Sequence, residues 1–295
     1  MIKDAAYYEA MFNNRAAVPE FQTHFDNWAQ RSEQARRTLD VELDVPYGDD
    51  RMETMDIFRP PAEAKALLMF IHGGYWRSLD KKQHSFVAAP FVNAGAAVAT
   101  INYSLCPAVK VEDIVMQCLK AGAWLYRNTA EVGAPRNRIF VAGHSAGGHL
   151  TAMCLAAQWP RYSRGLPEKV MQGGLSISGI YDLAPIARTP SINLDVRLTE
   201  AEATKVSPAL MQPATKAPFY IAVGGREIGG FKEQHALIAR QWSGVLAQDI
   251  PCPDDNHFTI LNTFANPQSE LCQAALRMMG LEAGEPRSVN GASEQ

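Results

Sequence analysis

The feature that most constrains this chain is the stretch Gly143-His-Ser-Ala-Gly147, which joins two segments of different character. Residues 139–142, just before it, are apolar and favour a buried strand, whereas the residues from Ala146 onward have the composition of a helix. A strand that turns directly into a helix strains and crowds the residue at the bend, so flanking glycines are needed for room. The pattern therefore predicts that Ser145 stands clear of a sheet at the positive end of a helix, as a nucleophile would. The alternative is a serine that only fills a tight turn.

Apolar runs alternate with helical patterns along most of the sequence. Leu and Val alternate with Asp and Glu at residues 39–45, and a turn then leads to residues 53–58, which predicts an antiparallel hairpin. The later runs favour strands buried on both faces. We therefore expect an α/β fold, with a doubly wound, mostly parallel sheet of about eight strands and helices on both faces. Strands are expected at residues 67–71, 96–101, 139–142, 174–178, 219–223 and 245–250, and helices at 7–12, 25–38, 111–125, 231–242 and 258–280.

The chain has 295 residues, of which 47% are hydrophobic, and no linker-like tract divides it. We therefore expect a single domain over residues 1–281. Residues 1–38 are polar on one side and aromatic on the other, which suits a helical arm or cap. Residues 179–217 are rich in Pro, Asp and Thr, as expected of a small cap insertion. Residues 282–295 are rich in Gly, Glu and Ser, which predicts a disordered tail.

Charge and composition exclude several classes of partner. A net charge of -3 provides no basic surface, so neither nucleic acid nor an anionic membrane is an expected partner. The N-terminus lacks the apolar core of a signal peptide and no run approaches a membrane span, which predicts a cytoplasmic protein. Five cysteines at irregular spacings favour buried apolar residues over disulfides or a zinc site. The oligomeric state stays open, with a homodimer as one option.

A nucleophilic serine needs a base, and that base needs a carboxylate to orient it. In this topology the order along the chain is serine, acid, histidine. Of the seven histidines, His257 is the one that follows Ser145 at the end of a predicted strand; the alternative is a histidine in a surface turn. Glu227 follows the preceding strand and is the expected acid, unless it is a solvated turn carboxylate. Its rivals are Asp249, Asp254 and Asp255.

Attack on a carbonyl creates an oxyanion, which needs preorganised N–H donors. The glycine-rich stretch at Gly73 and Gly74 follows a predicted strand and can supply them, together with the N–H group of Ala146. An ordinary glycine turn is the alternative. Metal-binding, phosphate-loop and dinucleotide motifs are absent from the sequence, so no cofactor is expected. Aromatic residues are more often part of the core than of a binding site. Five of them could nevertheless line a substrate pocket: Tyr75, Trp76, Phe86, Tyr103 and Tyr181.

Three motifs together resemble those of α/β-hydrolases in the hormone-sensitive-lipase-like esterase group: His72-Gly-Gly-Tyr-Trp76, Gly143-His-Ser-Ala-Gly147 and Asn256-His-Phe-Thr-Ile-Leu261. Leu79-Asp-Lys81 and residues 224–234 are similar, more specifically, to the kynurenine formamidase (arylformamidase) family. This resemblance runs from about Tyr8 to about Met279. This chain differs from the eukaryotic members of that family at the expected acid, because residue 227 is Glu and the eukaryotic members generally have Asp.

The resemblance implies an α/β-hydrolase fold and a serine hydrolase that acts on a small ester or an aryl formamide such as N-formylkynurenine. It also implies a catalytic triad of Ser145, Glu227 and His257, with oxyanion donors at Gly73, Gly74 and Ala146. Many proteins with this pattern are general carboxylesterases, so an esterase without a role in tryptophan breakdown is the first alternative. A ligand receptor built on the same fold is the second.

Overall fold

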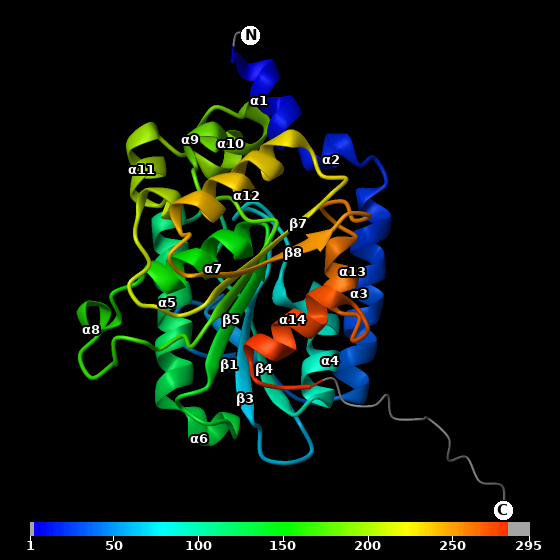
Figure 1. The fold of residues 1–295 in the computed structure, drawn as a ribbon, viewed down its shortest axis with the longest axis vertical. Helices are drawn as coiled ribbons and strands as arrows, with labels where there is room; N and C mark the ends of the chain where they lie inside the picture. The colour runs from blue at the N-terminus through cyan, green and yellow to red at the C-terminus, as the bar shows by residue number, and fades with distance from the viewer. Residues whose placement is uncertain (1–2, 283–295) are drawn as a thin grey trace, which may run out of the picture.

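The computed structural model describes residues 3–282, and within them eight strands form one sheet in the order β1-β2-β4-β3-β5-β6-β7-β8 (Figure 1). The predicted disordered tail, residues 282–295, lies outside the described residues apart from its first residue. The strands are β1 Asp40–Pro46, β2 Thr54–Arg59, β3 Ala66–Ile71, β4 Ala96–Ile101, β5 Ile139–His144, β6 Gly174–Ile177, β7 Phe219–Gly224 and β8 Leu246–Cys252. The predicted α/β fold is confirmed.

The sheet is antiparallel at one edge and parallel elsewhere. β1 and β2 form the predicted hairpin, with Val41 opposite Phe58, and β2 continues antiparallel to β4. From β4 to β8 every neighbouring pair is parallel. All residues of β3, β4 and β5 are buried, as expected of apolar strands covered on both faces.

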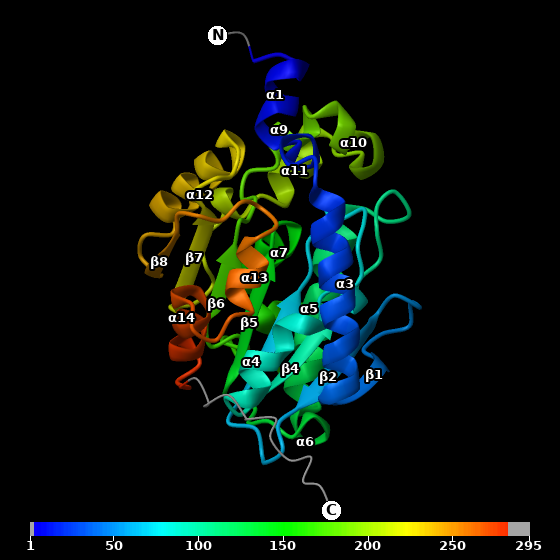
Figure 2. The ribbon, with the colours of Figure 1, turned by 90° about the vertical axis from the view of Figure 1, so that its right-hand side faces the viewer.

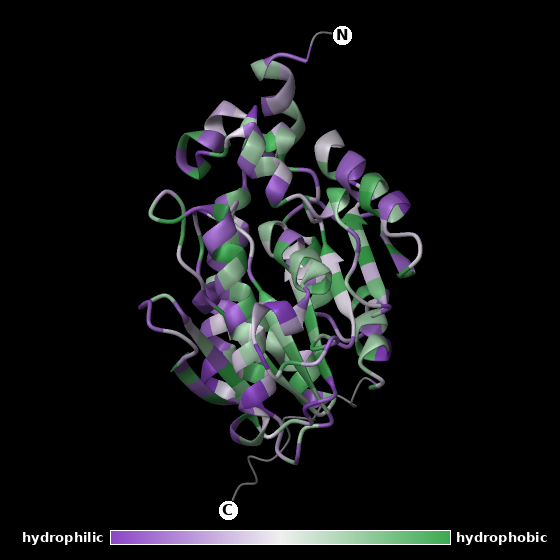
Figure 3. Ribbon diagram, turned by 90° about the vertical axis from the view of Figure 1, so that its left-hand side faces the viewer, coloured by the Kyte–Doolittle hydropathy of each residue, from purple (hydrophilic) through white to green (hydrophobic). Residues whose placement is uncertain are grey.

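Helices cover both faces of the sheet (Figures 1 and 2). Successive residues of β3 point to opposite faces, so Leu67 and Met69 join one core and Leu68 and Phe70 the other. One face is covered by α5 Val111–Arg127, α7 Ala146–Ala156 and α12 Gly229–Gln241, and the other by α3 Phe21–Thr38, α4 Ala88–Asn93, α13 Ile260–Phe264 and α14 Glu270–Met278. In Figure 3 the central strands are largely green, whereas purple residues gather on the outer helices and loops.

Short helices gather beyond the carboxyl ends of the strands (Figures 1 and 2). The segment 179–217, which appears irregular in the sequence, contains three of them. One begins with a capping box, in which Thr199 and Glu202 bond each other's backbone N–H groups. They are α9 Ala184–Ala187, α10 Pro190–Val196 and α11 Glu200–Lys205, and the N-terminal α1 Ala5–Phe12 packs against the first two.

The predicted continuous helix over residues 258–280 is wrong, because α13 and α14 are separate. Pro267 lies between them, where it cannot continue a helical hydrogen-bond pattern. The Ser269 side chain then accepts a hydrogen bond from the Cys272 N–H and starts α14. The remaining short helices are α2 Asn14–Ala17, α6 Thr129–Val132, α8 Trp159–Tyr162 and the 3₁₀ turns η1 Lys81–Gln83, η2 Ser85–Val87 and η3 Pro208–Leu210.

All five cysteines are free and buried, which confirms the expectation that they are core residues. Across residues 3–282, no helix combines the length and the apolarity that a membrane crossing requires.

Candidate active site

Ser145 stands at the junction of β5 and α7, with φ 58° and ψ -118°. A positive φ strains a residue that has a Cβ, and the surrounding packing holds the bend in place. A Cβ on Gly143 would lie 2.2 Å from the Gly147 carbonyl oxygen, and one on Gly147 would lie 2.0 Å from that of Ile71. Both glycines are therefore required by close backbone approach, for the reason that the sequence pattern indicates.

Three side chains that are distant in sequence meet at the carboxyl ends of β5, β7 and β8. Ser145 Oγ lies 3.0 Å from His257 Nε2, and His257 Nδ1 lies 2.7 Å from Glu227 Oε2. The three residues are 2%, 3% and 5% exposed in the order Ser145, His257, Glu227. The arrangement can move a proton from the hydroxyl to the imidazole while the carboxylate fixes the orientation of the ring.

The Glu227 carboxylate is held from its other side. The Gly224 N–H donates to Oε1 over 2.8 Å, and the Ser178 hydroxyl donates to the same oxygen over 2.5 Å. Oε2 is thereby left for His257. Ser178 was not singled out in the sequence, where the only signal is a small polar residue directly after the short strand β6.

The rival carboxylates have other partners. Asp249 accepts from His235, Asp254 pairs with Arg226, and Asp255 accepts from the hydroxyls of Thr259 and Thr263. None of the three forms a hydrogen bond with His257 in the described part of the chain.

His144, one residue before Ser145, supports the backbone of His257. Its Nε2–H donates to the His257 carbonyl oxygen over 2.8 Å, and the two rings lie 4.7 Å apart. Burial, together with the neighbouring His257 and His84, holds the pKa of His144 well below its usual value. A neutral His144 adds no positive charge beside the proton-accepting ring.

The loop at Gly73 and Gly74 packs directly against the serine. A Cβ on Gly73 would lie 3.0 Å from Ser145 Cβ, and Gly74 has φ 107°, where a Cβ would lie 2.0 Å from the Ser78 carbonyl oxygen. Within residues 3–282, the N–H groups of Gly73, Gly74 and Ala146 donate no hydrogen bond to the protein. They are the kind of unpaired donors that an oxyanion site requires.

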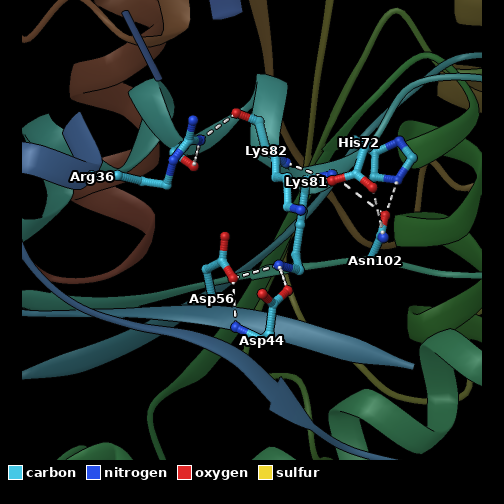
Figure 4. Close-up of polar contacts among 9 residues, drawn as sticks. Arg36, Asp44, Asp56, His72, Lys81, Lys82 and Asn102 are labelled. Atoms are coloured by element: carbon cyan, nitrogen blue, oxygen red, sulfur yellow. Dashed lines mark hydrogen bonds and ion pairs between the residues drawn. The ribbon is translucent and has the colours of Figure 1, made fainter. Parts of the chain in front are cut away.

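A polar chain leads from the sheet edge to this loop (Figure 4). His72 Nδ1 lies 2.7 Å from the Gly73 carbonyl oxygen, and His72 Nε2 lies 3.1 Å from Asn102 Oδ1. The Lys81 N–H donates to the same Asn102 oxygen. Lys81 Nζ in turn pairs with Asp56 in β2, over 2.5 Å, and with Asp44 in β1, over 2.6 Å. The hairpin and the loop are thus connected through buried side chains.

The two aromatic residues after the glycines point in different directions. Tyr75 lines the pocket over Ser145, and its hydroxyl donates to the Phe12 carbonyl oxygen. Trp76 is fully buried, donates to His149 Nδ1 over 3.2 Å, and is not among the residues that line this pocket. The structure therefore brings Tyr75, but not Trp76, to the site.

A small pocket lies above Ser145 and His257. Its outer wall comes from the N-terminal arm, which contributes Asn14, Arg15, Phe25 and Trp28. The aromatic side of the arm was visible in the sequence, but which of its residues face the serine was not. Leu79 and Phe258 complete the apolar lining.

Comparison with known proteins places this chain among hydrolases. Residues 55–224, more than half of the chain, match the BD-FAE family model. The kynurenine formamidase of Salmo salar is 30% identical over 88% of this chain and 88% of its own length. The esterase LipC of Mycobacterium tuberculosis is 32% identical over 46% of this chain and 35% of its own length.

The crystal structure of a protein of Silicibacter sp. TM1040, described as a candidate thioesterase, superposes with a TM-score of 0.79. It is 31% identical, and the match covers 92% of this chain and 97% of that one. Together with the formamidase and esterase relatives, it indicates that this chain is a hydrolase of ester or amide substrates. The chain belongs to the BD-FAE family of α/β-hydrolases and is a homologue of kynurenine formamidases.

Proposed function

We propose that this protein is a serine hydrolase that cleaves a small ester or an aryl formamide through an acyl-enzyme intermediate. The contact chain from Ser145 Oγ through His257 to Glu227 is the observation that supports the proposal most strongly. A structural cluster would not need a strained serine beside unpaired N–H groups, whereas a nucleophile does.

In the proposed mechanism, Ser145 Oγ attacks the acyl carbon while His257 Nε2 accepts the hydroxyl proton. Glu227 keeps the proton on Nδ1 and stabilises the imidazolium that forms. The N–H groups of Gly73, Gly74 and Ala146 bind the oxyanion. His257 then gives its proton to the departing amine or alcohol, and a water molecule, deprotonated by the same ring, releases the acid from the serine.

An aryl formamide is the favoured substrate class for two reasons. The similarity to kynurenine formamidases extends over most of both chains. The pocket is small and lined by aromatic side chains of the arm and of Tyr75, which suits a ring next to a short acyl group. A general carboxylesterase is the second candidate, supported by the similarity to the esterase LipC over part of the chain.

Replacing Ser145 tests the proposal. Ser145→Ala is expected to abolish hydrolysis of both p-nitrophenyl acetate and N-formylkynurenine, with the circular dichroism spectrum and melting temperature close to those of the wild type. Full activity in this variant would refute the nucleophile. The ratio of kcat/KM for N-formylkynurenine over simple acyl esters then separates a formamidase from a general esterase.

A further inference from the structure

Arg15, in the short helix α2, lies at the wall of the proposed active-site pocket. Its guanidinium lies over the rings of Phe21 and Phe25, at 5.4 and 5.5 Å from their centroids. Nη2 donates to the Ser78 hydroxyl over 3.0 Å, and that hydroxyl donates to the Gly74 carbonyl oxygen. The cation is therefore held in place beside the loop at Gly73 and Gly74, and within residues 3–282 Nη2 is the only one of its nitrogens that donates to the protein.

The charge of Arg15 has no counter-ion in the described protein. Within residues 3–282, no carboxylate pairs with it, whereas Arg77 nearby pairs with Asp195. None of the side chains that line the pocket is a carboxylate, and Arg15 is the only lysine or arginine among them. Half-burial, and then the charge of Arg77, lower the pKa of Arg15, but a guanidinium stays protonated at neutral pH. A half-buried cation that lacks a counter-ion has lost part of its hydration, and an anionic ligand would offset that loss.

We propose that Arg15 binds a carboxylate on the substrate, so that the preferred substrates are aryl esters or formamides that bear a carboxylate. The proposal rests on the proposed function and names its substrate class. In the proposed complex, the acyl group would lie at Ser145, the aromatic ring among Phe25, Trp28 and Tyr75, and the carboxylate at the planar guanidinium, all of which line the pocket. A planar guanidinium can donate two N–H groups to one carboxylate. Such a contact is more specific for a carboxylate than that of a point charge such as an ammonium group.

A matched pair of substrates tests the proposal. 4-Acetoxybenzoate and 4-acetoxybenzamide have the same shape but differ in charge. Arg15→Gln is expected to lower the ratio of kcat/KM for the benzoate over that for the benzamide by about 10- to 100-fold, because a hydrogen-bonded charge is lost. The loss is expected in KM, since the contact is present in ground and transition states alike. Arg15→Lys is expected to restore part of the preference.

Arg31 provides the control. It is also a half-buried arginine of the arm, its guanidinium lies 4.6 Å from the Phe86 ring centroid, and it donates to Asn262 Oδ1, but it does not line the pocket. Arg31→Gln is expected to leave the ratio between the two substrates unchanged. An equal loss on both substrates in Arg15→Gln would mean that Arg15 only supports the oxyanion loop through Ser78, and would overturn the proposal. The proposal would also be overturned if Arg31→Gln changed the ratio between the two substrates as much as Arg15→Gln does.

Binding without turnover separates this proposal from the proposed function. Calorimetric titration of Ser145→Ala with 4-hydroxybenzoate and 4-hydroxybenzamide is expected to show tighter binding of the benzoate, and the preference should disappear when Arg15→Gln is added. If the benzoate preference is present but wild-type protein hydrolyses neither ester, the proposed function fails and the carboxylate site stands. Equal binding of both ligands would overturn the carboxylate site alone.

Discussion

At the scale of single residues, the geometry around Glu227 explains which carboxylate can orient His257, the proposed base. One carboxylate oxygen accepts from the Gly224 N–H and from Ser178, and the other faces His257 Nδ1. A carboxylate held in this way keeps the imidazole in the tautomer that leaves Nε2 free to accept a proton. In the described part of the chain, neither the exposed Asp254 nor the half-buried Asp255 of the turn after β8 contacts His257 in this way.

Glu227→Gln is therefore expected to lower kcat by about two to four orders of magnitude, because an amide cannot stabilise the imidazolium and can favour the wrong tautomer. Steady-state kinetics with p-nitrophenyl acetate measures the loss. Asp254→Asn makes the same chemical change in a carboxylate that pairs with Arg226 instead, and is expected to leave kcat near the wild-type value. Equal rates in the two variants would mean that Glu227 does not orient the ring.

At the scale of elements, a buried ion pair joins the β1–β2 hairpin to the segment that follows the loop at Gly73 and Gly74 (Figure 4). Lys81 is 1% exposed and Asp56 is fully buried, so the pair lies out of contact with bulk solvent. Asp56 Oδ1 also accepts from the Asp44 N–H, at an irregularity in strand β1 where Asp44 has φ 56°. Loss of one partner would leave a charge in a low-dielectric environment.

Lys81→Met is expected to lower the free energy of unfolding by about 3–5 kcal/mol, because it leaves the Asp56 carboxylate buried and unpaired. Asp56→Asn combined with Lys81→Met is expected to recover part of that loss, since both charges are then gone. Urea unfolding followed by circular dichroism measures both values. The single variant Asp56→Asn completes the cycle. If the loss in the double variant equals the sum of the losses in the two single variants, Lys81 and Asp56 are not coupled.

At the scale of the whole molecule, burial shifts the pKa of several histidines in the same direction. It lowers the pKa of His149 to about 4 and that of His84 to about 3. Burial also lowers the pKa of His72, and it lowers that of His144 well below the usual value. Each of these side chains is neutral in the folded protein over a pH range where the unfolded chain binds a proton.

The stability of the protein is therefore expected to be greatest above about pH 6.5 and to fall as the pH decreases toward 4, because the unfolded state binds protons first. Each buried histidine contributes about 1.4 kcal/mol per pH unit in that window. Urea unfolding between pH 7 and pH 5 measures the slope. His149→Gln is expected to lower this slope by up to about 1.4 kcal/mol per pH unit, which corresponds to one proton. An unchanged slope would mean that His149 does not contribute.

How much could be predicted from the sequence depended on how local each feature is. The strands, the serine bend and the strand-end positions of Glu227 and His257 follow from apolar runs and short motifs, which act within a few residues. The break between α13 and α14 could have been predicted from Pro267 and the cap at Ser269. Trp76 follows the glycine loop as Tyr75 does, but the backbone turns its ring into the core.

Other features depend on distant parts of the chain. Arg15 and Phe25 reach the pocket because the arm packs against it, and although the aromatic side of the arm indicates a cap, its sequence does not indicate which residues face Ser145. Likewise, the contact of Ser178 with Glu227 joins two loops that are 49 residues apart. Side chains whose role depends on such tertiary contacts could not be assigned from periodicity or spacing.

The central claim is that Ser145 is a nucleophile activated by His257, and covalent labelling with a fluorophosphonate tests it most directly. Mass spectrometry of the digested protein is expected to find the phosphonyl group on Ser145, with labelling slowed by orders of magnitude in His257→Gln. A label on another residue, or wild-type labelling rates without the imidazole, would contradict the account.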